Sequence, residues 1–280
     1  MWVWSKLSAA KWYDAWEERF RGNPNTIISF IKGGKSIRVE AYIESEEDAK
    51  TVQDHFGGSI RELKSQNWEQ LAEQPARPPI KIRDQLVVVI SDKEEEIEEA
   101  RSTYQDRAIL QIPAEMAFGT GDHATTSTCL RLLSDEAKRL NSEREAWSMA
   151  DLGTGSGLLA IAAAKLGASE LWGCDYDPHA VTVAAKNAQR NATEQIGFEE
   201  VDVLDWTPPR SWDLVCANLF STILQEAFGT IKKCVAPGGR LIISGILNEQ
   251  WDETYVKAEE AGLTLEKKVQ KGKWTTALLR

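Results

Sequence analysis

Apolar positions along the second half of the chain follow two alternating periods. Short apolar runs, each long enough for one buried strand, alternate with segments in which apolar residues return every three or four positions. Strands are predicted at 148–152, 170–174, 198–201, 212–217, 239–244, 263–269 and 274–279, and helices at 125–139, 158–166, 178–192, 221–234 and 248–261. Such alternation predicts an α/β domain, doubly wound around a mostly parallel sheet, with the last two strands forming a closing hairpin.

The first 65 residues predict a separate small domain. Strands are predicted at 2–4, 25–32, 37–43 and 59–64, and helices at 8–21 and from Ser45 to the pair Gly57-Gly58. The order βαββαβ is that of the α+β ferredoxin-like fold. Four aromatic residues fall on one face of the first helix: Trp12, Tyr13, Trp16 and Phe20. Because helical spacing alone predicts burial, we expect these rings in the core rather than in a platform for a ligand.

The segment between these domains, 66–110, has a less regular pattern. A helical run at 67–71 precedes three prolines, one apolar strand is predicted at 86–90, and an acidic block spans 92–99. We interpret the segment as a connector that docks on the larger domain. The acidic block is predicted to be a solvated helix face, with attraction of a basic partner as the alternative. The expected domains are therefore 1–65, 66–110 and 111–280.

A glycine-rich loop lies between the strand that ends at Leu152 and the helix that follows. Gly153, Gly155 and Gly157 leave room for the backbone to pass close to a nucleotide, because glycine has no Cβ. Asp175 ends the next predicted strand, where a carboxylate can accept hydrogen bonds from ribose hydroxyls. Together these features predict an adenosine-containing cofactor. The alternative is a tight turn followed by a solvated aspartate.

The spacing of the glycines distinguishes two kinds of cofactor. A dinucleotide fingerprint has the spacing Gly-x-Gly-x-x-Gly and faces a pyrophosphate, whereas the spacing here is Gly-x-Gly-x-Gly. With Asp151 ahead of it, this loop resembles the first motif of S-adenosylmethionine-dependent methyltransferases. A more specific likeness lies upstream. The run Met116–Thr126 is similar to the signature of the methyltransferases that modify large-subunit ribosomal protein eleven.

The resemblance to this family extends beyond the two motifs. Further matching runs are Asp175–Val181, Asp213–Phe220 and Pro237–Leu247, so the likeness covers most of residues 111–250. It implies a Rossmann-like methyltransferase domain that binds S-adenosylmethionine. Asp122 and Ala124 depart from the residues that are commoner in the signature, but neither is a position expected to bind a ligand.

The same resemblance implies roles for individual residues. Contacts with the cofactor are expected from Thr126, Gly153, Gly155, Asp175, Asn218 and, as a lid, Phe118. Asn218 is also the expected catalytic residue, since related enzymes orient the acceptor amine with oxygen atoms at this strand end. The alternative is an asparagine that closes a turn. For His123 we favour a structural hydrogen bond over a general base. For Asp202, contact with adenine and a solvated acid both stay open.

The resemblance implies an enzyme that transfers methyl groups from S-adenosylmethionine to lysine side-chain and N-terminal amines of large-subunit ribosomal protein eleven. The N-terminal domain is then expected to recognise the substrate. The alternative enzyme is a methyltransferase of another protein or of a small amine. A third possibility, of another class, is a non-catalytic, cofactor-binding ribosome assembly factor.

Composition limits the partners. The net charge of −10 and the pI of about 5.0 argue against a free nucleic-acid substrate and are compatible with a basic protein. No apolar run approaches the roughly 20 residues that a membrane span needs. The first residues lack the features of a secretory signal. We therefore expect a cytoplasmic protein without membrane contact, and a monomer.

The cysteines and histidines do not suggest a metal site. The four cysteines show no Cys-x-x-Cys spacing, and the three histidines are scattered singly, so no zinc template can be assembled. Three of the cysteines stand in apolar strand or helix segments. They are expected to be buried free thiols.

Overall fold

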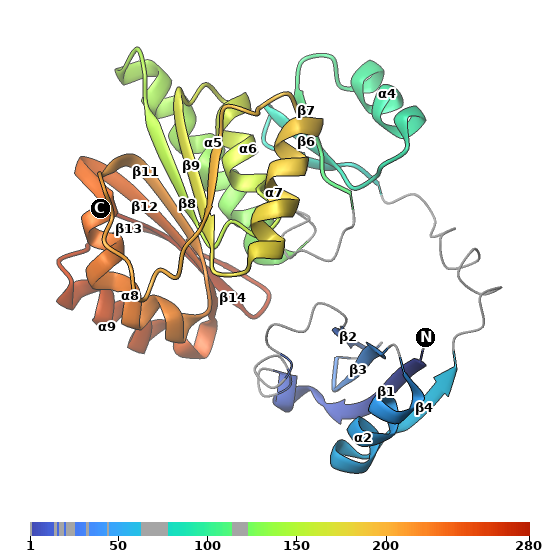
Figure 1. Ribbon diagram of the computed structural model, residues 1–280. Helices are drawn as coiled ribbons and strands as arrows, with labels where there is room; N and C mark the ends of the chain where they lie inside the picture. Colours follow the sequence, from blue (N-terminus) through green and yellow to red (C-terminus); the bar gives the residue numbers. More distant parts are fainter. Residues whose placement is uncertain are drawn as a thin grey trace. The chain divides into compact units, whose positions relative to one another are not determined.

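The chain forms two compact units, Met1–Ala76 and Arg77–Arg280. A computed structural model describes residues 2–13, 16, 20, 26–31, 34–43, 45–62, 78–113 and 123–280. Figure 1 colours both units along the sequence, and each is described by itself. Among the described residues, no helix is long and apolar enough to cross a membrane.

The first unit is built on one antiparallel sheet. Its strands are β1 (Trp2–Ala9), β2 (Thr26–Phe30), β3 (Ser36–Ile43) and β4 (Ser59–Glu62), in the spatial order β2-β3-β1-β4. Helix α2 (Glu46–Phe56) lies between β3 and β4 in the sequence. It begins where the Ser45 side chain accepts a hydrogen bond from the Asp48 backbone N–H, and it ends at Gly57, whose φ is +67°.

The expected first helix begins later than Ser8. Ser8 and Ala9 extend β1 and pair with Ile37 and Ser36 of β3, because hydrogen bonds across the sheet are available to them. A short 3-10 helix, Ala10–Trp12, follows, and most of the remaining segment lies outside the described residues. Trp16 and Phe20 contact Trp4, with ring centroids 6.0 and 5.7 Å apart, and these rings form the core as expected. Trp12, in contrast, is 53% exposed.

The second unit starts with a small sheet where the sequence predicted a single strand. Its strands are β5 (Ile80–Ile82), β6 (Leu86–Val89) and β7 (Ala108–Gln111), with helix α4 (Glu94–Thr103) between β6 and β7. The glutamates of α4 are largely exposed, whereas Ile97 and Ala100 are buried against Val87 and Val89. The acidic block is therefore a solvated helix face, as favoured.

The larger sheet has seven strands. They are β8 (Ser148–Leu152), β9 (Glu170–Asp175), β10 (Gly197–Glu200), β11 (Trp212–Asn218), β12 (Val235–Leu247), β13 (Leu265–Lys271) and β14 (Trp274–Leu279). Their order is β10-β9-β8-β11-β12-β14-β13, parallel from β10 to β12, with β14 and β13 added antiparallel. The predicted doubly wound α/β domain and its closing hairpin are confirmed.

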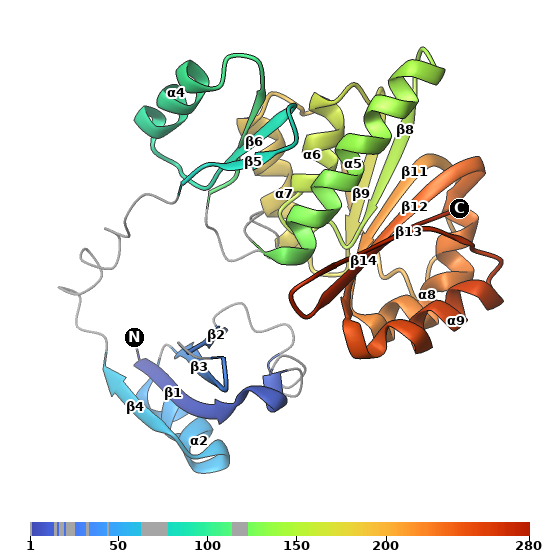
Figure 2. The same ribbon diagram turned by 180° about the vertical axis from the view of Figure 1, so that it is seen from behind.

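Helices cover both faces of this sheet (Figures 1 and 2). They are α5 (Ala124–Glu143), α6 (Leu158–Lys165), α7 (Pro178–Arg190), α8 (Ser221–Cys234) and α9 (Trp251–Glu260), the last preceded by the 3-10 helix Asn248–Gln250. α5 and α6 share one apolar core with the small sheet, and α8 and α9 share the core on the other face. The small sheet is thus an integral part of the larger unit.

The four cysteines are buried free thiols, as expected. Burial raises the pKa of the Cys129 thiol to about 12 and that of Cys216 well above its ordinary value. Thiols that stay protonated in this way are poor nucleophiles. The cysteines therefore serve packing.

Candidate active site

The carboxyl ends of three neighbouring strands form the candidate site. β9, β8 and β11 are adjacent and parallel, and they end at Asp175, Leu152 and Asn218. In open α/β sheets, ligands bind beyond these strand ends. The topology therefore brings the glycine loop after β8 together with side chains from the ends of β9 and β11.

The glycine loop adopts backbone angles that other residues avoid. Gly153, Gly155 and Gly157 have φ values of +69°, +53° and +79°. A Cβ on Gly157 would lie 3.0 Å from the Ala184 Cβ, so this glycine also allows α6 to start close to α7. The sequence pattern thus reflects both a turn and a close helix contact.

Asp175 is tied to the glycine loop. Its Oδ2 accepts a hydrogen bond from the Gly155 N–H at 2.9 Å, and its Oδ1 accepts one from the Asp177 N–H at 3.1 Å. Burial raises the pKa of Asp175, and the two backbone donors oppose that rise. The carboxylate is held between the loop and the start of α7. Its remaining lone pairs are available to the hydroxyls of a ribose.

Asp151 is a second carboxylate at this edge, and sequence reasoning did not include it among the cofactor-binding residues. It is 1% exposed, and its Oδ2 accepts a hydrogen bond of 2.8 Å from the Thr154 hydroxyl. Its Oδ1 is buried without a partner among the described residues. Burial raises the pKa of Asp151 to about 7, although the Thr154 hydrogen bond opposes the shift. The sequence signals for it were its place ahead of the glycines and at the end of a predicted strand.

Asn218 and Thr126 meet although they are far apart in the sequence. Thr126 is 2% exposed in the first turn of α5, and the Asn218 Nδ2 donates to its Oγ1 at 3.5 Å. This long contact orients the amide. The Asn218 Oδ1 is buried, and no described residue donates to it. A buried amide oxygen without a partner is ready to accept a hydrogen bond from a ligand.

His123 and Asp202 have structural partners. His123 precedes α5, where its Nδ1 lies 2.7 Å from the Thr125 Oγ1 and accepts from the Thr125 N–H at 3.4 Å. Its ring packs edge-on against Trp274, with centroids 5.2 Å apart. Asp202 accepts a hydrogen bond from the Leu204 N–H at 2.9 Å. These contacts favour the structural interpretation of both residues.

Phe118 lies outside the described residues, as does most of the Met116–Thr126 run. Of the residues predicted to bind the cofactor, the structure therefore describes Thr126, Gly153, Gly155, Asp175 and Asn218. All five lie at or next to the carboxyl ends of the parallel strands. In the described part of the chain, no group of three or more histidine, cysteine or acidic side chains could hold a metal ion.

The charges at this edge suit a cationic ligand better than a pyrophosphate. Asp151 and Asp175 stand on either side of the glycine loop, and the Gly155 N–H is already donated to a carboxylate. The Asp175 carboxylate would repel a phosphate group, and so would Asp151 when it is ionised, whereas S-adenosylmethionine carries a sulfonium and an ammonium. The chemistry of these residues therefore fits that cofactor.

Comparison with known proteins identifies the family. A protein-family model for ribosomal protein L11 methyltransferase (PrmA) matches residues 4–280. The chain belongs to the ribosomal protein L11 methyltransferase family. This membership confirms the enzyme class and the cofactor expected from the sequence, a methyltransferase that uses S-adenosylmethionine.

Individual L11 methyltransferases differ in how much of their length the chain matches. The proteins of Brucella suis and Dictyoglomus turgidum are 33% and 30% identical, over 98% and 86% of this chain and 96% and 80% of their own length. The protein of Desulforapulum autotrophicum is 40% identical, but the chain spans about half of it, 53%. A crystal structure of the ribosomal protein L11 methylase of Lactobacillus delbrueckii subsp. bulgaricus is 26% identical, with a TM-score of 0.61 over 72% of this chain and 97% of that one.

Proposed function

We propose that this protein transfers methyl groups from S-adenosylmethionine to lysine side-chain and N-terminal amines of ribosomal protein L11. Family membership over residues 4–280 supports the substrate. The observation that carries the chemistry is the buried Oδ1 of Asn218 beside Thr126, which accepts a hydrogen bond from none of the described residues. We place the reaction in the cytoplasm, with a monomeric enzyme that needs neither a membrane nor a free nucleic acid.

Asn218 orients the acceptor amine. Bound S-adenosylmethionine supplies a methyl group that its sulfonium has already activated. The amine must arrive neutral although a free lysine has a pKa of about 10.4, and desolvation at the buried sheet edge favours the neutral form. An amine N–H donated to the Asn218 Oδ1 directs the nitrogen lone pair toward the methyl group. Alignment of this kind is the main source of rate in such a displacement.

The other predicted residues hold the cofactor. Asp175 accepts hydrogen bonds from the ribose while it keeps the loop N–H of Gly155 in place. The backbone at Gly153 approaches the methionine part, and Thr126 contacts the cofactor while it fixes the Asn218 amide. Phe118 covers the ligand as a lid. These assignments are part of the proposal.

The N-terminal unit recognises the substrate, and its fold is ferredoxin-like. The sheet order β2-β3-β1-β4 supports this fold. Leu7 and Ile27 pair with Arg38 and Glu40, which are two residues apart on β3, so their side chains share one face of the sheet. Leu7 is 62% exposed and Ile27 is 50% exposed. Arg38 and Glu40 lie between them, so this face offers both apolar and charged contacts to a protein partner.

The test uses purified ribosomal protein L11 and single-turnover methyl transfer at saturating cofactor. Asn218→Ala should lower the rate on the order of 10²-fold, as loss of a near-attack alignment can, with little change in cofactor affinity. Gln195→Ala is the matched control, because it removes an exposed side-chain amide just before β10. This position is at the amino-terminal end of that strand, whereas Asn218 is at the carboxyl end of β11. It should leave the rate unchanged.

Two results would contradict the proposal. An Asn218→Ala rate within about threefold of the parent, well below one tenfold step of 1.36 kcal/mol, would mean that Asn218 only closes a turn. No methylation of ribosomal protein L11 by the parent would favour another protein, a small amine or a non-catalytic assembly factor. A screen with radiolabelled methyl groups separates the first two from the last.

A further inference from the structure

A cleft of about 350 Å³ lies within the second unit, between the small sheet with α4 and the ends of α6 and α7. Figures 1 and 2 show α4, β6 and β7 beside these helices. α6 and α7 start at the glycine-loop edge and run back against the strand direction. Their last residues therefore lie near the amino-terminal ends of the strands, and so does the cleft. The candidate active site lies at the opposite, carboxyl ends.

The cleft is strongly basic. Arg101, Arg107, Lys165 and Arg190 line it, and none of the described residues that line it is acidic. The chain as a whole carries a net charge of −10. The positive charge of this cleft therefore contrasts with the negative charge of the protein as a whole. Cations gathered in a cleft attract an anion.

Helix dipoles account for only part of this arrangement. Arg101, Lys165 and Arg190 stand in the last turns of α4, α6 and α7, where a cation offsets the negative end of a helix. This effect explains one cation at each helix end. It does not explain why three helix ends meet at one cleft, with Arg107 added from the turn before β7 and without a lining carboxylate among the described residues.

Arg107 and Arg190 have hydrogen-bond partners within the protein: Arg107 donates to the Arg83 carbonyl oxygen, and Arg190 donates to the Asn187 Oδ1 at 2.8 Å. The other two cations can respond to a ligand. Lys165 makes no ion pair with any residue that the structure describes, and it is exposed enough at the cleft to reach an anion. Arg101 pairs with Glu94 and Glu98 of its own helix, but these exposed pairs contribute little and can exchange for a phosphate.

The cleft is held in shape by hydrogen bonds between its two walls. The Asn191 side chain accepts from the Gln111 N–H at 2.9 Å and donates to the Gln111 carbonyl oxygen at 2.8 Å. This pair joins β7 to the residue that follows α7. Tyr104 and Ile109, both half-buried, add an aromatic ring and an apolar surface to the lining.

We propose that this cleft binds the phosphate backbone of an RNA chain. Four cations from three helices and one turn exceed what a single phosphate needs, which favours a chain of phosphates over a free one. The Lys81 ammonium lies over the Tyr104 ring, 4.9 Å from its centroid, and adds a further cation next to the cleft. RNA is here a docking partner rather than a substrate, and because the protein is acidic overall, the binding is weak and sensitive to salt. The inference goes beyond methyl transfer and does not depend on it.

The test measures binding of a fluorescent single-stranded RNA to the full-length protein by anisotropy at low salt. The double variant Lys165→Glu/Arg190→Glu should lower the affinity at least about tenfold. It should also reduce the slope of log K against log salt by about 1.4, because each of the two side chains neutralises one phosphate and a single strand contributes about 0.7 to the slope per phosphate. Lys165→Gln/Arg190→Gln, which only neutralises the charges, should also lower the affinity for RNA, but by less. Methylation of free ribosomal protein L11 should not change in either variant.

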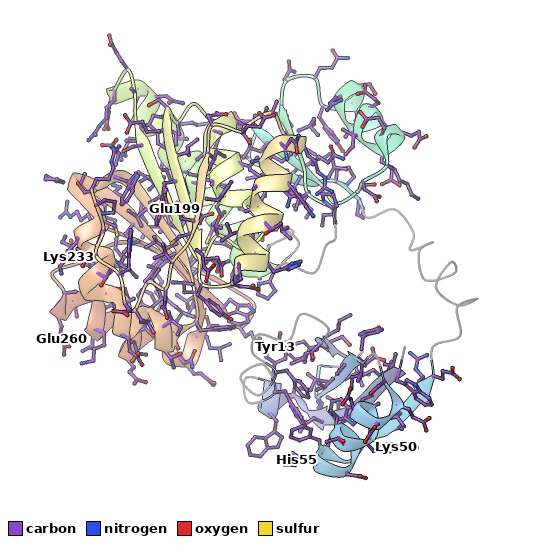
Figure 3. The ribbon with its side chains drawn as sticks, viewed as in Figure 1. Tyr13, Lys50, His55, Glu199, Lys233 and Glu260 are labelled. Carbon is purple, nitrogen blue, oxygen red and sulfur yellow. The ribbon has the colours of Figure 1, made fainter. Side chains whose placement is uncertain are left out.

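Lys232→Glu/Lys233→Glu is the matched control. It makes the same charge change in the last turn of another helix, α8, on the opposite face of the sheet, where Figure 3 labels Lys233. At the 0.1 M point of the salt series it should bind RNA within about twofold of the parent, because exposed charges are screened there over about 10 Å.

Three outcomes would overturn the inference. The parent could fail to bind RNA at low salt, or the control could lose as much affinity as the cleft variant. AMP or inorganic phosphate could also displace the RNA at an equal concentration of phosphate groups. That last result would make a small phosphate compound, rather than RNA, the ligand of the cleft. Each readout is independent of methyl transfer, so failure here leaves the proposed function standing.

Discussion

At the scale of single residues, the two carboxylates beside the glycine loop differ in their partners. Asp175 accepts two backbone hydrogen bonds and is only partly buried, whereas Asp151 is fully buried with one oxygen unpartnered among the described residues. Asp175 therefore has a role in both the loop and the ligand site. Asp151 is the more costly group to keep ionised, because its burial removes the carboxylate from water.

Asp175→Ala should weaken binding of S-adenosylmethionine. A hydrogen bond to a charged group contributes about 1.5–3 kcal/mol, and the variant also releases the Gly155 N–H from its acceptor. Isothermal calorimetry gives the dissociation constant directly. Asp177→Ala, which removes the cap of α7, is the control for a loosened helix start. A dissociation constant for Asp175→Ala equal to that of the parent would exclude a ribose contact.

Stability should depend on pH through Asp151. Its folded pKa of about 7 lies above the ordinary value of 3.8, so at intermediate pH the folded chain keeps a proton that the unfolded chain has released. Because the unfolded chain then binds fewer protons, the free energy of unfolding falls as pH rises from about 4 to 7, by at most roughly 1.4 kcal/mol per pH unit. Asp151→Asn should remove this slope in denaturant unfolding. Parallel stability curves for the variant and the parent would show that Asp151 does not titrate in this range.

The sequence predicted which side chains meet beyond the strand ends better than it predicted the environment of each. Thr126 and Asn218 were expected to serve one site, and the Asp175 carboxylate was expected at a strand end, because parallel strands end at a common edge. The burial of the Asp151 carboxyl group could not be predicted. It depends on burial beside Cys129 and Cys216, which come from α5 and β11 and meet only in the folded chain.

At the scale of elements, long periodic segments were predicted well and short ones were not. The helix over Ser221–Cys234 and the strand over Trp274–Leu279 have the predicted bounds. β5 and β7 were missed, since runs of three and four residues carry too little pattern to distinguish a strand from a loop. β1 extends into the predicted helix because its pairing with β3 is a contact distant in sequence.

The junction of β8 with α6 should tolerate no side chain at Gly157. Its φ of +79° costs an L-residue about 1–2 kcal/mol, and a Cβ would lie 3.0 Å from the Ala184 Cβ. We expect Gly157→Ala to destabilise the protein by roughly 1–3 kcal/mol in thermal or denaturant unfolding. Gly229→Ala is the matched control: it lies within α8, has no described neighbour within 4 Å of an added Cβ, and should stabilise the helix by up to about 1 kcal/mol. Equal stability of the two variants would mean that the loop adapts.

At the scale of the whole molecule, the two units have separate cores. Among the described residues, every buried cluster of the second unit is made of residues from Ile80 onward, and that of the first unit ends at Ile60. Each core can therefore form without the other. The candidate site described above also belongs entirely to the second unit, so cofactor binding and substrate recognition should be separable by truncation.

Removal of residues 1–76 should leave cofactor binding near that of the parent. The kcat/KM for methylation of ribosomal protein L11 should fall at least about 100-fold, which corresponds to about 2.7 kcal/mol of lost recognition. Calorimetry with S-adenosylmethionine and a mass-spectrometric assay of the ribosomal protein measure the two effects.

The full-length variant Leu7→Glu/Ile27→Glu provides a second measurement if the truncated chain does not fold. It replaces the two exposed apolar side chains of this sheet face with carboxylates, without touching the core of the first unit. Ser29→Glu, on the same face beside Arg38, controls for added negative charge. An undiminished rate for the truncated protein would show that the second unit recognises its substrate alone.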